Sequence, residues 1–241
     1  MAGRAGSPDL DRRLRDLAER YGLTDEASAQ LRSLHRLLVE DPRAPTAVRD
    51  PLHVVDDHLA DSLVALDLEP VRHARAMADL GSGAGVPGLP LAIALPGTSV
   101  TLVDSSTRKC AFLERAVATC HVTNARVVHA RLESWPEGLG SFDLVTARAL
   151  GPLDVVAEYA APLLTLGGSL VVWRGRRDSE AEAAGAHAAV KIGLQAGRIV
   201  PVRPYPSAQN RYLHLMSKVR NTPPEFPRRP GVAIKRPLGR T

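Results

Sequence analysis

Apolar residues recur along the first third of this chain with the period of an α-helix and later gather into short continuous runs. In residues 9–21 and 25–38, leucine and alanine return every three or four positions, which is typical of amphipathic helices. A third helix is expected over residues 50–66. From residue 74 onward, short apolar runs alternate with helical stretches, which is typical of strands buried on both faces. The pattern therefore predicts a helical N-terminal part followed by an α/β unit with a parallel sheet.

Residues 9–73 form the predicted helical part and residues 74–219 the predicted α/β unit; residues 1–8 are expected to be disordered. The strands are expected at 76–80, 99–103, 125–129, 142–147, 169–173, 198–203 and 211–219, with the last two pairing antiparallel. The helices of this unit are expected at 89–95, 107–120, 153–164 and 178–195.

Residues 76–88, Ala-Met-Ala-Asp-Leu-Gly-Ser-Gly-Ala-Gly-Val-Pro-Gly, organise the α/β unit as strand, glycine turn and helix. Such a turn lets a ligand lie against bare main chain beside the free N–H groups of a helix start. Gly83, Gly85 and Gly88 match the G-x-G-x-x-G spacing of dinucleotide sites. Gly81, Gly83 and Gly85 match the tighter G-x-G-x-G of S-adenosylmethionine enzymes.

The position of the strand favours the second alternative. The first glycine should follow the strand directly, and from Gly81 the third dinucleotide glycine would fall on Val86. Asp79, two residues before the turn, can accept the methionine ammonium of S-adenosylmethionine, whereas it would repel a pyrophosphate. We therefore expect S-adenosylmethionine as the cofactor and S-adenosylhomocysteine as the product.

Further polar candidates follow the ends of the next strands. Asp104 lies about 20 residues beyond the turn, where an acid can bind the ribose hydroxyls of an adenosine cofactor. Leu132 and Glu133 follow the third strand, where an adenine can lie. Arg148 ends the fourth strand and Arg174 follows the fifth, so both are expected at the carboxyl edge of the sheet, beside the cofactor crevice.

His58 and Asp61 lie one turn apart on the third predicted helix. Such a pair could bind part of a metal's coordination shell, but no second ligand cluster completes it. We expect a polar face turned toward a neighbouring pocket, and no metal. Cys110 and Cys120 are too few and too far apart for a zinc site or a disulfide scaffold, and buried thiols are expected.

The net charge of +5 is concentrated at the C-terminus. Residues 220–241 hold six basic residues and one acidic residue, so the other 219 residues carry 25 of each sign. We expect this proline-rich tail to be flexible or draped on the surface, with Arg228 and Arg229 available to the phosphates of a polyanion. The chain has no run as long as a membrane span and no signal-peptide core at its start, so we expect a cytoplasmic protein.

Several segments together match a known family. They are Pro45-Thr-Ala-Val-Arg-Asp50-Pro51, His58-Leu-Ala-Asp61-Ser62-Leu63, residues 79–90, Asp104-Ser-Ser-Thr-Arg-Lys109, Thr146-Ala-Arg148-Ala149 and Asn221-Thr-Pro-Pro-Glu-Phe-Pro-Arg-Arg-Pro-Gly231. Through them the chain resembles the bacterial small-subunit ribosomal RNA guanine-N7 methyltransferase G family, also called glucose-inhibited division protein B. The resemblance covers nearly the whole chain after about residue 9. Arg174 stands where the family usually has lysine, and Val86 where it usually has phenylalanine.

The resemblance implies an α/β fold, a Rossmann-like class I S-adenosylmethionine-dependent methyltransferase with a seven-stranded, mostly parallel sheet and a helical N-terminal extension. It implies methyl transfer to N7 of a guanine in 16S ribosomal RNA, with that RNA or the small ribosomal subunit as partner. The cofactor contacts carried over are Gly81, Val86, Asp104, Ser105, Ser106, Leu132, Glu133 and Arg148. Arg148 and Arg174 are candidates for catalysis by holding the base and its phosphate. The substrate-facing candidates are His58, Asp61, Arg174, Arg228 and Arg229.

Other interpretations remain open. The same cofactor could serve methylation of another RNA, a protein or a small molecule. A nicotinamide-dependent oxidoreductase is a second alternative, disfavoured by Asp79, and an RNA-binding module with a vestigial pocket is a third. We expect a monomer. If RNA is the substrate, removal of residues 220–241 should weaken RNA binding and leave cofactor affinity unchanged.

Overall fold

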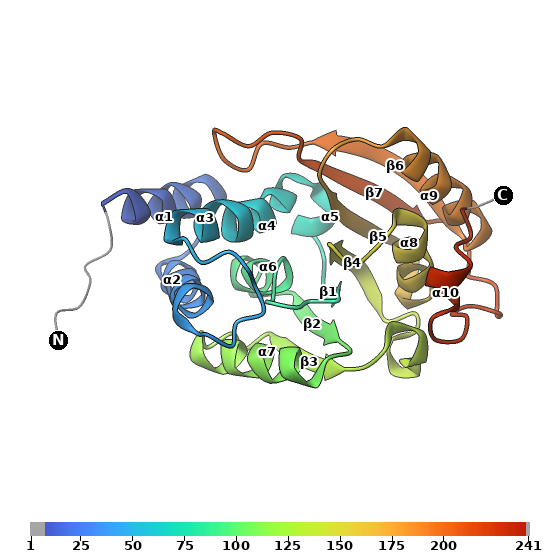
Figure 1. Ribbon diagram of the computed structural model, residues 1–241, viewed down its shortest axis with the longest axis horizontal. Helices are drawn as coiled ribbons and strands as arrows, with labels where there is room; N and C mark the ends of the chain where they lie inside the picture. The colour runs from blue at the N-terminus through green and yellow to red at the C-terminus, as the bar shows by residue number, and fades with distance from the viewer. Residues whose placement is uncertain (1–7, 240–241) are drawn as a thin grey trace.

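The computed structural model describes residues 8–239 of the chain (Figure 1). It begins with α1 (Pro8–Tyr21) and α2 (Asp25–Glu40), whose leucine faces are buried as their periodicity predicts. Thr24 caps α2 by accepting a hydrogen bond from the N–H of Ala27 at 3.1 Å. The predicted disorder of residues 1–8 concerns residues outside the described part, apart from Pro8, which opens α1.

The third predicted helix is a succession of short segments of different helical type. They are α3 (Pro51–Val54), the π-helical η1 (Val55–Ala60), α4 (Asp61–Leu63), the 3₁₀ turn η2 (Val64–Asp67) and α5 (Glu69–Arg72). Asp50 caps α3 by accepting from the N–H groups of Leu52 and His53 at 3.0 and 2.9 Å. A π-helical turn is wider than an α-helical one and is often found at functional sites. Here it holds Asp57 and His58, and Asp61 follows it directly.

The sheet has seven strands, as predicted, and their order is β3-β2-β1-β4-β5-β7-β6. The strands are β1 (Ala76–Leu80), β2 (Ser99–Asp104), β3 (Ala125–His129), β4 (Phe142–Arg148), β5 (Leu164–Arg174), β6 (Leu194–Pro201) and β7 (Tyr212–Lys218). β7 runs antiparallel to both of its neighbours, β5 and β6, and the other pairs of strands are parallel. Leu80 pairs with Val103 of β2 and with Ala147 of β4, so these three strands end level with one another. The strand order reverses between β1 and β4, where open α/β sheets bind their ligands.

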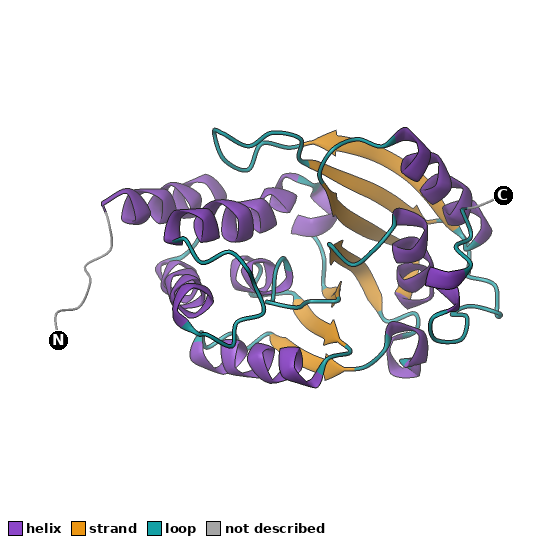
Figure 2. Ribbon diagram, viewed as in Figure 1, coloured by secondary structure: helices purple, strands orange, loops and turns teal. Residues whose placement is uncertain are grey.

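Helices cover both faces of the sheet and form two hydrophobic cores (Figure 2). One core joins the N-terminal helices with α6 (Gly88–Ala94) and α7 (Thr107–Thr119). The other joins α8 (Leu153–Ala160), the 3₁₀ turn η5 (Ala161–Leu163) and α9 (Ser179–Lys191). Cys110 and Cys120 are buried thiols, as expected. Within residues 8–239, no helix is long and apolar enough to cross a bilayer.

Some predicted boundaries differ from the structure. The fifth strand starts at Leu164 instead of residue 169, because Gly167 and Gly168 continue the strand instead of ending a turn. A Cβ on Gly168 would lie 3.0 Å from the carbonyl oxygen of Asp143, so a side chain there would crowd the close approach of β5 to β4. The sixth strand is Leu194–Pro201 instead of 198–203, and α9 ends at Lys191 instead of residue 195.

The described part of the C-terminal tail packs on the domain, which agrees with the second of the two expected alternatives, a tail draped on the surface, and not with a flexible one. Arg228 donates two hydrogen bonds to the carboxylate of Glu158, a residue of α8 that is 1% exposed. Ala233, in the short helix α10 (Val232–Lys235), is buried in the α8 core, and Phe226 packs against the same core. The tail has too few apolar residues for a core of its own, but it completes one that the domain already provides.

Candidate functional site

The glycine turn after β1 adopts backbone conformations that favour glycine. Gly81, Gly83 and Gly85 have φ values of +67°, +55° and +83°. A Cβ on Gly81 would lie 2.6 Å from Leu150, and one on Gly85 would lie 2.4 Å from Leu89. A Cβ on Gly83 would meet only a carbonyl oxygen at 3.6 Å and otherwise point into open space. Gly83 therefore marks the place in the turn where a ligand can approach the main chain.

Asp79 lies beneath this turn and has no exposed surface. Its Oδ1 accepts from the hydroxyl of Thr146 at 2.8 Å, and its Oδ2 accepts from the N–H of Gly88 at 3.2 Å. Burial raises the pKa of Asp79 to about 6, against the hydrogen bonds that favour its charged form. Both carboxylate oxygens of Asp79 thus have partners that support the turn, and the contact with the methionine ammonium stays a prediction.

Asp104 ends β2 beside the turn, as predicted. Its carboxylate accepts from the N–H of Gly83 at 3.1 Å and from the N–H of Ser106 at 2.9 Å, and the amine of Lys109 lies 3.4 Å away. These bonds fix the carboxylate at the carboxyl edge of the sheet and connect it to the glycine turn. Ser105, next to Asp104, is exposed at the same edge.

Leu132 and Glu133 lie in a 3₁₀ turn, η3 (Leu132–Ser134), that follows β3. The Oε1 atom of Glu133 accepts a hydrogen bond from the backbone N–H of Gly231, in the C-terminal tail, at 2.9 Å. The tail therefore touches a residue that the sequence assigns to the cofactor. Removal of residues 220–241 is expected to disturb this side of the site, contrary to the expectation of unchanged cofactor affinity.

Arg148 extends from the end of β4 to the π-helical segment η1 and to α4. Its Nη1 donates to the carbonyl of Asp57 at 2.8 Å and to Oδ2 of Asp61 at 2.9 Å, and its Nη2 lies 3.3 Å from Nδ1 of His58. A guanidinium can only donate, so Nδ1 is the acceptor and Nε2 of His58 carries the proton. That Nε2 lies 2.7 Å from the hydroxyl of Thr46. Both ring nitrogens are thus engaged, and burial with the nearby Arg148 lowers the pKa of His58 to about 4.

Asp61 is 6% exposed and lies between two arginines. Its backbone carbonyl accepts from the indole N–H of Trp173 at 2.6 Å, and its Oδ1 lies 3.5 Å from Nε of Arg211. Oδ1 is buried without a hydrogen-bond partner within the described residues. Burial raises the pKa of Asp61 although Arg148 opposes the shift. An unsatisfied carboxylate oxygen in a functional cleft is a position where a ligand donor can bind.

These side chains surround a cavity of about 280 Å³ at the end of β4 and β5. It is lined by Asp61, Arg148, Ala149, Trp173, Arg174, Gly175, Val202, Arg211 and Tyr212. The guanidinium of Arg174 donates to the carbonyl of Gly151 at 3.1 Å. The structure thus brings three of the predicted substrate-facing residues, His58, Asp61 and Arg174, to this cavity or its wall, whereas Arg228 is bound to Glu158 and does not line it.

Sequence reasoning missed Arg211 and Trp173. Arg211 precedes β7, and Tyr212 pairs with Arg174 across the antiparallel strands. The predicted antiparallel pairing could have shown that the start of the last strand lies beside the end of the fifth. Among the described residues, no cluster of three or more His, Cys, Asp or Glu side chains has the arrangement of a metal site.

A mostly parallel seven-stranded sheet with an antiparallel β7, and a glycine turn at the point where the strand order reverses, define a class I S-adenosylmethionine-dependent methyltransferase fold. A solved S-adenosylmethionine-dependent methyltransferase from Aquifex aeolicus shares this fold, with a TM-score of 0.54 and 15% identity over 69% of this chain and 93% of that one. The family model for rRNA small subunit methyltransferase G matches residues 34–201. The chain belongs to this family.

Two curated relatives agree with this assignment, and both are named ribosomal RNA small subunit methyltransferase G. The protein from Synechococcus sp. (strain JA-2-3B'a(2-13)) is 36% identical over 235 residues, which is 90% of this chain and 88% of that one. The protein from Carboxydothermus hydrogenoformans is 33% identical over 240 residues, which is 95% of this chain and 100% of that one. The resemblance stated from the sequence is therefore confirmed.

Proposed function

We propose that this protein transfers a methyl group from S-adenosylmethionine to N7 of a guanine in 16S ribosomal RNA. One observation supports it above the others: Arg148, Arg174 and Arg211 line one cavity, and Arg148 ends β4, the strand that pairs with β1 next to the glycine turn. The family assignment supplies ribosomal RNA as the substrate class, and the cavity supplies a place for one base.

The residues around the turn fit the cofactor. The open space at Gly83 leaves room for the ligand to pass against main chain, and Asp104 at the end of β2 can accept from ribose hydroxyls. Leu132, Glu133 and Val86 complete the expected contacts with the adenosine. When bound, S-adenosylmethionine supplies a methyl group that is activated by its sulfonium.

The chemistry at guanine needs orientation more than proton transfer. N7 has a free lone pair and no hydrogen, so no general base is required. The guanidinium groups of Arg148 and Arg174 can donate to O6 and to the phosphate while N7 stays free to react. Three contacts to Asp57, His58 and Asp61 hold Arg148 in place before the substrate arrives. Catalysis would then come from positioning and fixed charge.

The size of the cavity restricts the form of the substrate. About 280 Å³ is near the lower limit of ligand pockets, roughly 300 Å³, so it suits a single base turned out of a strand. The deep major groove of an A-form helix hides N7. The target is therefore expected in a loop or an incompletely assembled small subunit. We expect the protein to work in the cytoplasm as a monomer and without a metal.

Methyl transfer can be tested with radiolabelled S-adenosylmethionine and small subunits from cells that lack this gene. We expect label in 16S RNA and chain cleavage at one N7-methylguanine after reduction and aniline treatment. Arg174→Met should lose most of the activity, because the cavity loses a donor, whereas Arg174→Lys should keep part of it. Arg176→Met is the matched control, since Arg176 is exposed and outside the cavity. Label in protein or small molecules only would refute the proposed substrate.

A further inference from the structure

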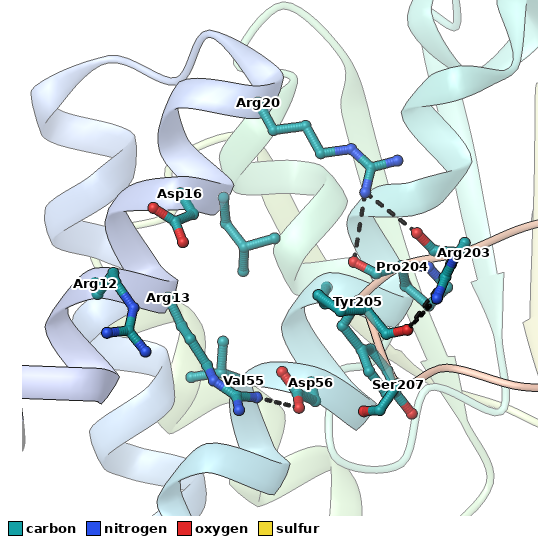
Figure 3. A pocket seen from close by; sticks show the side chains of 13 residues that line it. Arg12, Arg13, Asp16, Arg20, Val55, Asp56, Arg203, Pro204, Tyr205 and Ser207 are labelled. Atoms are coloured by element: carbon teal, nitrogen blue, oxygen red, sulfur yellow. Dashed lines mark hydrogen bonds and ion pairs between the residues drawn. The ribbon is translucent and has the colours of Figure 1, made fainter.

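A second, larger hollow lies between α1, the π-helical segment η1 and the loop that joins β6 to β7 (Figure 3). Its volume is about 790 Å³. Four arginines, Arg12, Arg13, Arg20 and Arg203, line it together with two aspartates, and apolar side chains and prolines form the rest of its wall. We call this hollow the arginine groove. No step of the proposed methyl transfer uses it.

Three of the four arginines can exchange their present partners for a phosphate. Arg12 pairs with Asp9 at 2.7 Å, and both side chains are more than half exposed. Arg20 pairs with Asp67 at 3.0 Å, with both side chains exposed, and its Nη1 also donates long hydrogen bonds to the carbonyls of Arg203 and Pro204 at 3.3 and 3.4 Å. Exposed ion pairs of this kind contribute little and are easily replaced. Arg203 donates to the carbonyl of Pro206 and makes no ion pair within residues 8–239. Arg13 differs, because it is bound to Asp56, which is largely buried.

A hydrogen-bonded wall separates the arginine groove from the cavity of about 280 Å³ at the ends of β4 and β5. The hydroxyl of Tyr205, which lines the groove, donates to Oδ1 of Asp57 at 2.7 Å. The same Oδ1 accepts from Arg211 at 3.1 Å, and Arg211 lines the cavity. The groove and the cavity therefore lie on either side of one hydrogen-bonded group, formed by Tyr205, Asp57 and Arg211.

We infer that the arginine groove is a second RNA subsite that binds the phosphates of a single-stranded segment next to the target guanine. Arg12, Arg20 and Arg203 contact the phosphates, and the ring of Tyr205 offers a stacking surface for a base. Positively charged grooves with an aromatic side chain among the cations are the usual arrangement for single strands, because every base has a face that can stack. This inference rests on the proposed function, since it identifies the flanking strand of the same substrate.

The test compares two triple variants that remove the same charge. The groove variant is Arg12→Gln, Arg20→Gln and Arg203→Gln. The control variant is Arg15→Gln, Arg36→Gln and Arg198→Gln, at exposed arginines of α1, α2 and β6 that do not line the groove. Affinity for 16S RNA transcribed in vitro is measured by filter binding over a salt series, without turnover. Melting curves check that both variants fold, and Arg12→Gln alone is a milder second variant.

Each phosphate contact to a single strand contributes about 0.7 to the slope of log affinity against log salt. The groove variant should therefore lose about 2 in slope and bind roughly 100-fold more weakly at 0.1 M salt. In the methylation assay its KM should rise while kcat stays unchanged, and Arg12→Gln should lose about 0.7 in slope. Equal slopes for the groove and control variants would overturn the groove but leave methyl transfer standing. A wild-type protein that binds RNA but transfers no methyl group would overturn the proposed function alone.

Discussion

Replacing Arg228 by alanine should destabilise this protein far more than replacing its neighbour Arg229. Arg228 bridges both carboxylate oxygens of Glu158, whose side chain is 2% exposed, and its Nη2 also donates to the carbonyl of Arg236 at 2.9 Å. Arg229 is exposed, and its side chain makes no hydrogen bond or ion pair within residues 8–239. The two arginines are adjacent in sequence and identical in charge, so only the docking of the tail separates them.

The loss of stability in Arg228→Ala can be estimated from the carboxylate charge of Glu158 that remains buried without a partner. Removing one partner of a buried ion pair leaves an uncompensated charge and costs about 3–5 kcal/mol. For Glu158 a value near 4 kcal/mol should lower the melting temperature by roughly 8–16 °C in a chain of this size. An exposed arginine without partners changes the free energy of unfolding by about 0.5 kcal/mol or less. Arg229→Ala should therefore melt within about 2 °C of the wild type.

Urea unfolding followed by circular dichroism measures both variants. The combination of Arg228→Ala with Glu158→Gln should recover part of the lost stability, because it removes the buried charge as well as its partner. Equal stability of the Arg228→Ala and Arg229→Ala variants would refute the docked tail. It would return Arg228 to the set of residues available for RNA phosphates.

Three further predictions concern the candidate site. Gly83→Val should abolish S-adenosylmethionine binding in calorimetry, whereas Gly22→Val should not. Gly22 is the control because both glycines have positive φ and open surroundings, so a backbone strain of about 1–2 kcal/mol is common to both variants. Equal binding by the two variants would remove the glycine turn from the cofactor site. Asp104→Ala should weaken cofactor binding by about 1.5–3 kcal/mol, through lost hydrogen bonds to a charged acceptor, and unchanged affinity would exclude Asp104. His58 has a pKa of about 4 when folded and about 6.5 when unfolded, so the unfolded chain binds more protons as pH falls. The wild type should thus lose about 2 kcal/mol of stability between pH 7 and pH 5 that His58→Gln does not lose, and parallel pH profiles in urea would contradict the neutral, Arg148-bound histidine.

The sequence by itself determined most of the fold and the position of the glycine turn. Hydrophobic periodicity records which face of each element is buried, so the expected strands 125–129 and 142–147 lie within one residue of β3 and β4. The turn at Gly81, Gly83 and Gly85 could be predicted because the positive φ values of these glycines depend on local backbone sterics. The placement of Asp104 and Arg148 at the carboxyl ends of β2 and β4 could also be predicted, because both residues directly follow the apolar runs of these strands.

Only the tertiary structure decided what the charged side chains contact. Arg211 and Asp57 are 154 positions apart in sequence, and Arg148 and Asp61 are 87 apart, yet each pair shares a hydrogen bond or ion pair in the cavity wall. No periodic pattern encodes such pairs, because they depend on strand register, on the π-helical turn and on the direction of β7. The contacts of the C-terminal tail could not be predicted from the sequence either. Its composition indicated that it could not fold alone. In the structure, the buried carboxylate of Glu158 on α8 and the hydrophobic core around α8 hold the tail in place, and both exist only once the domain has folded.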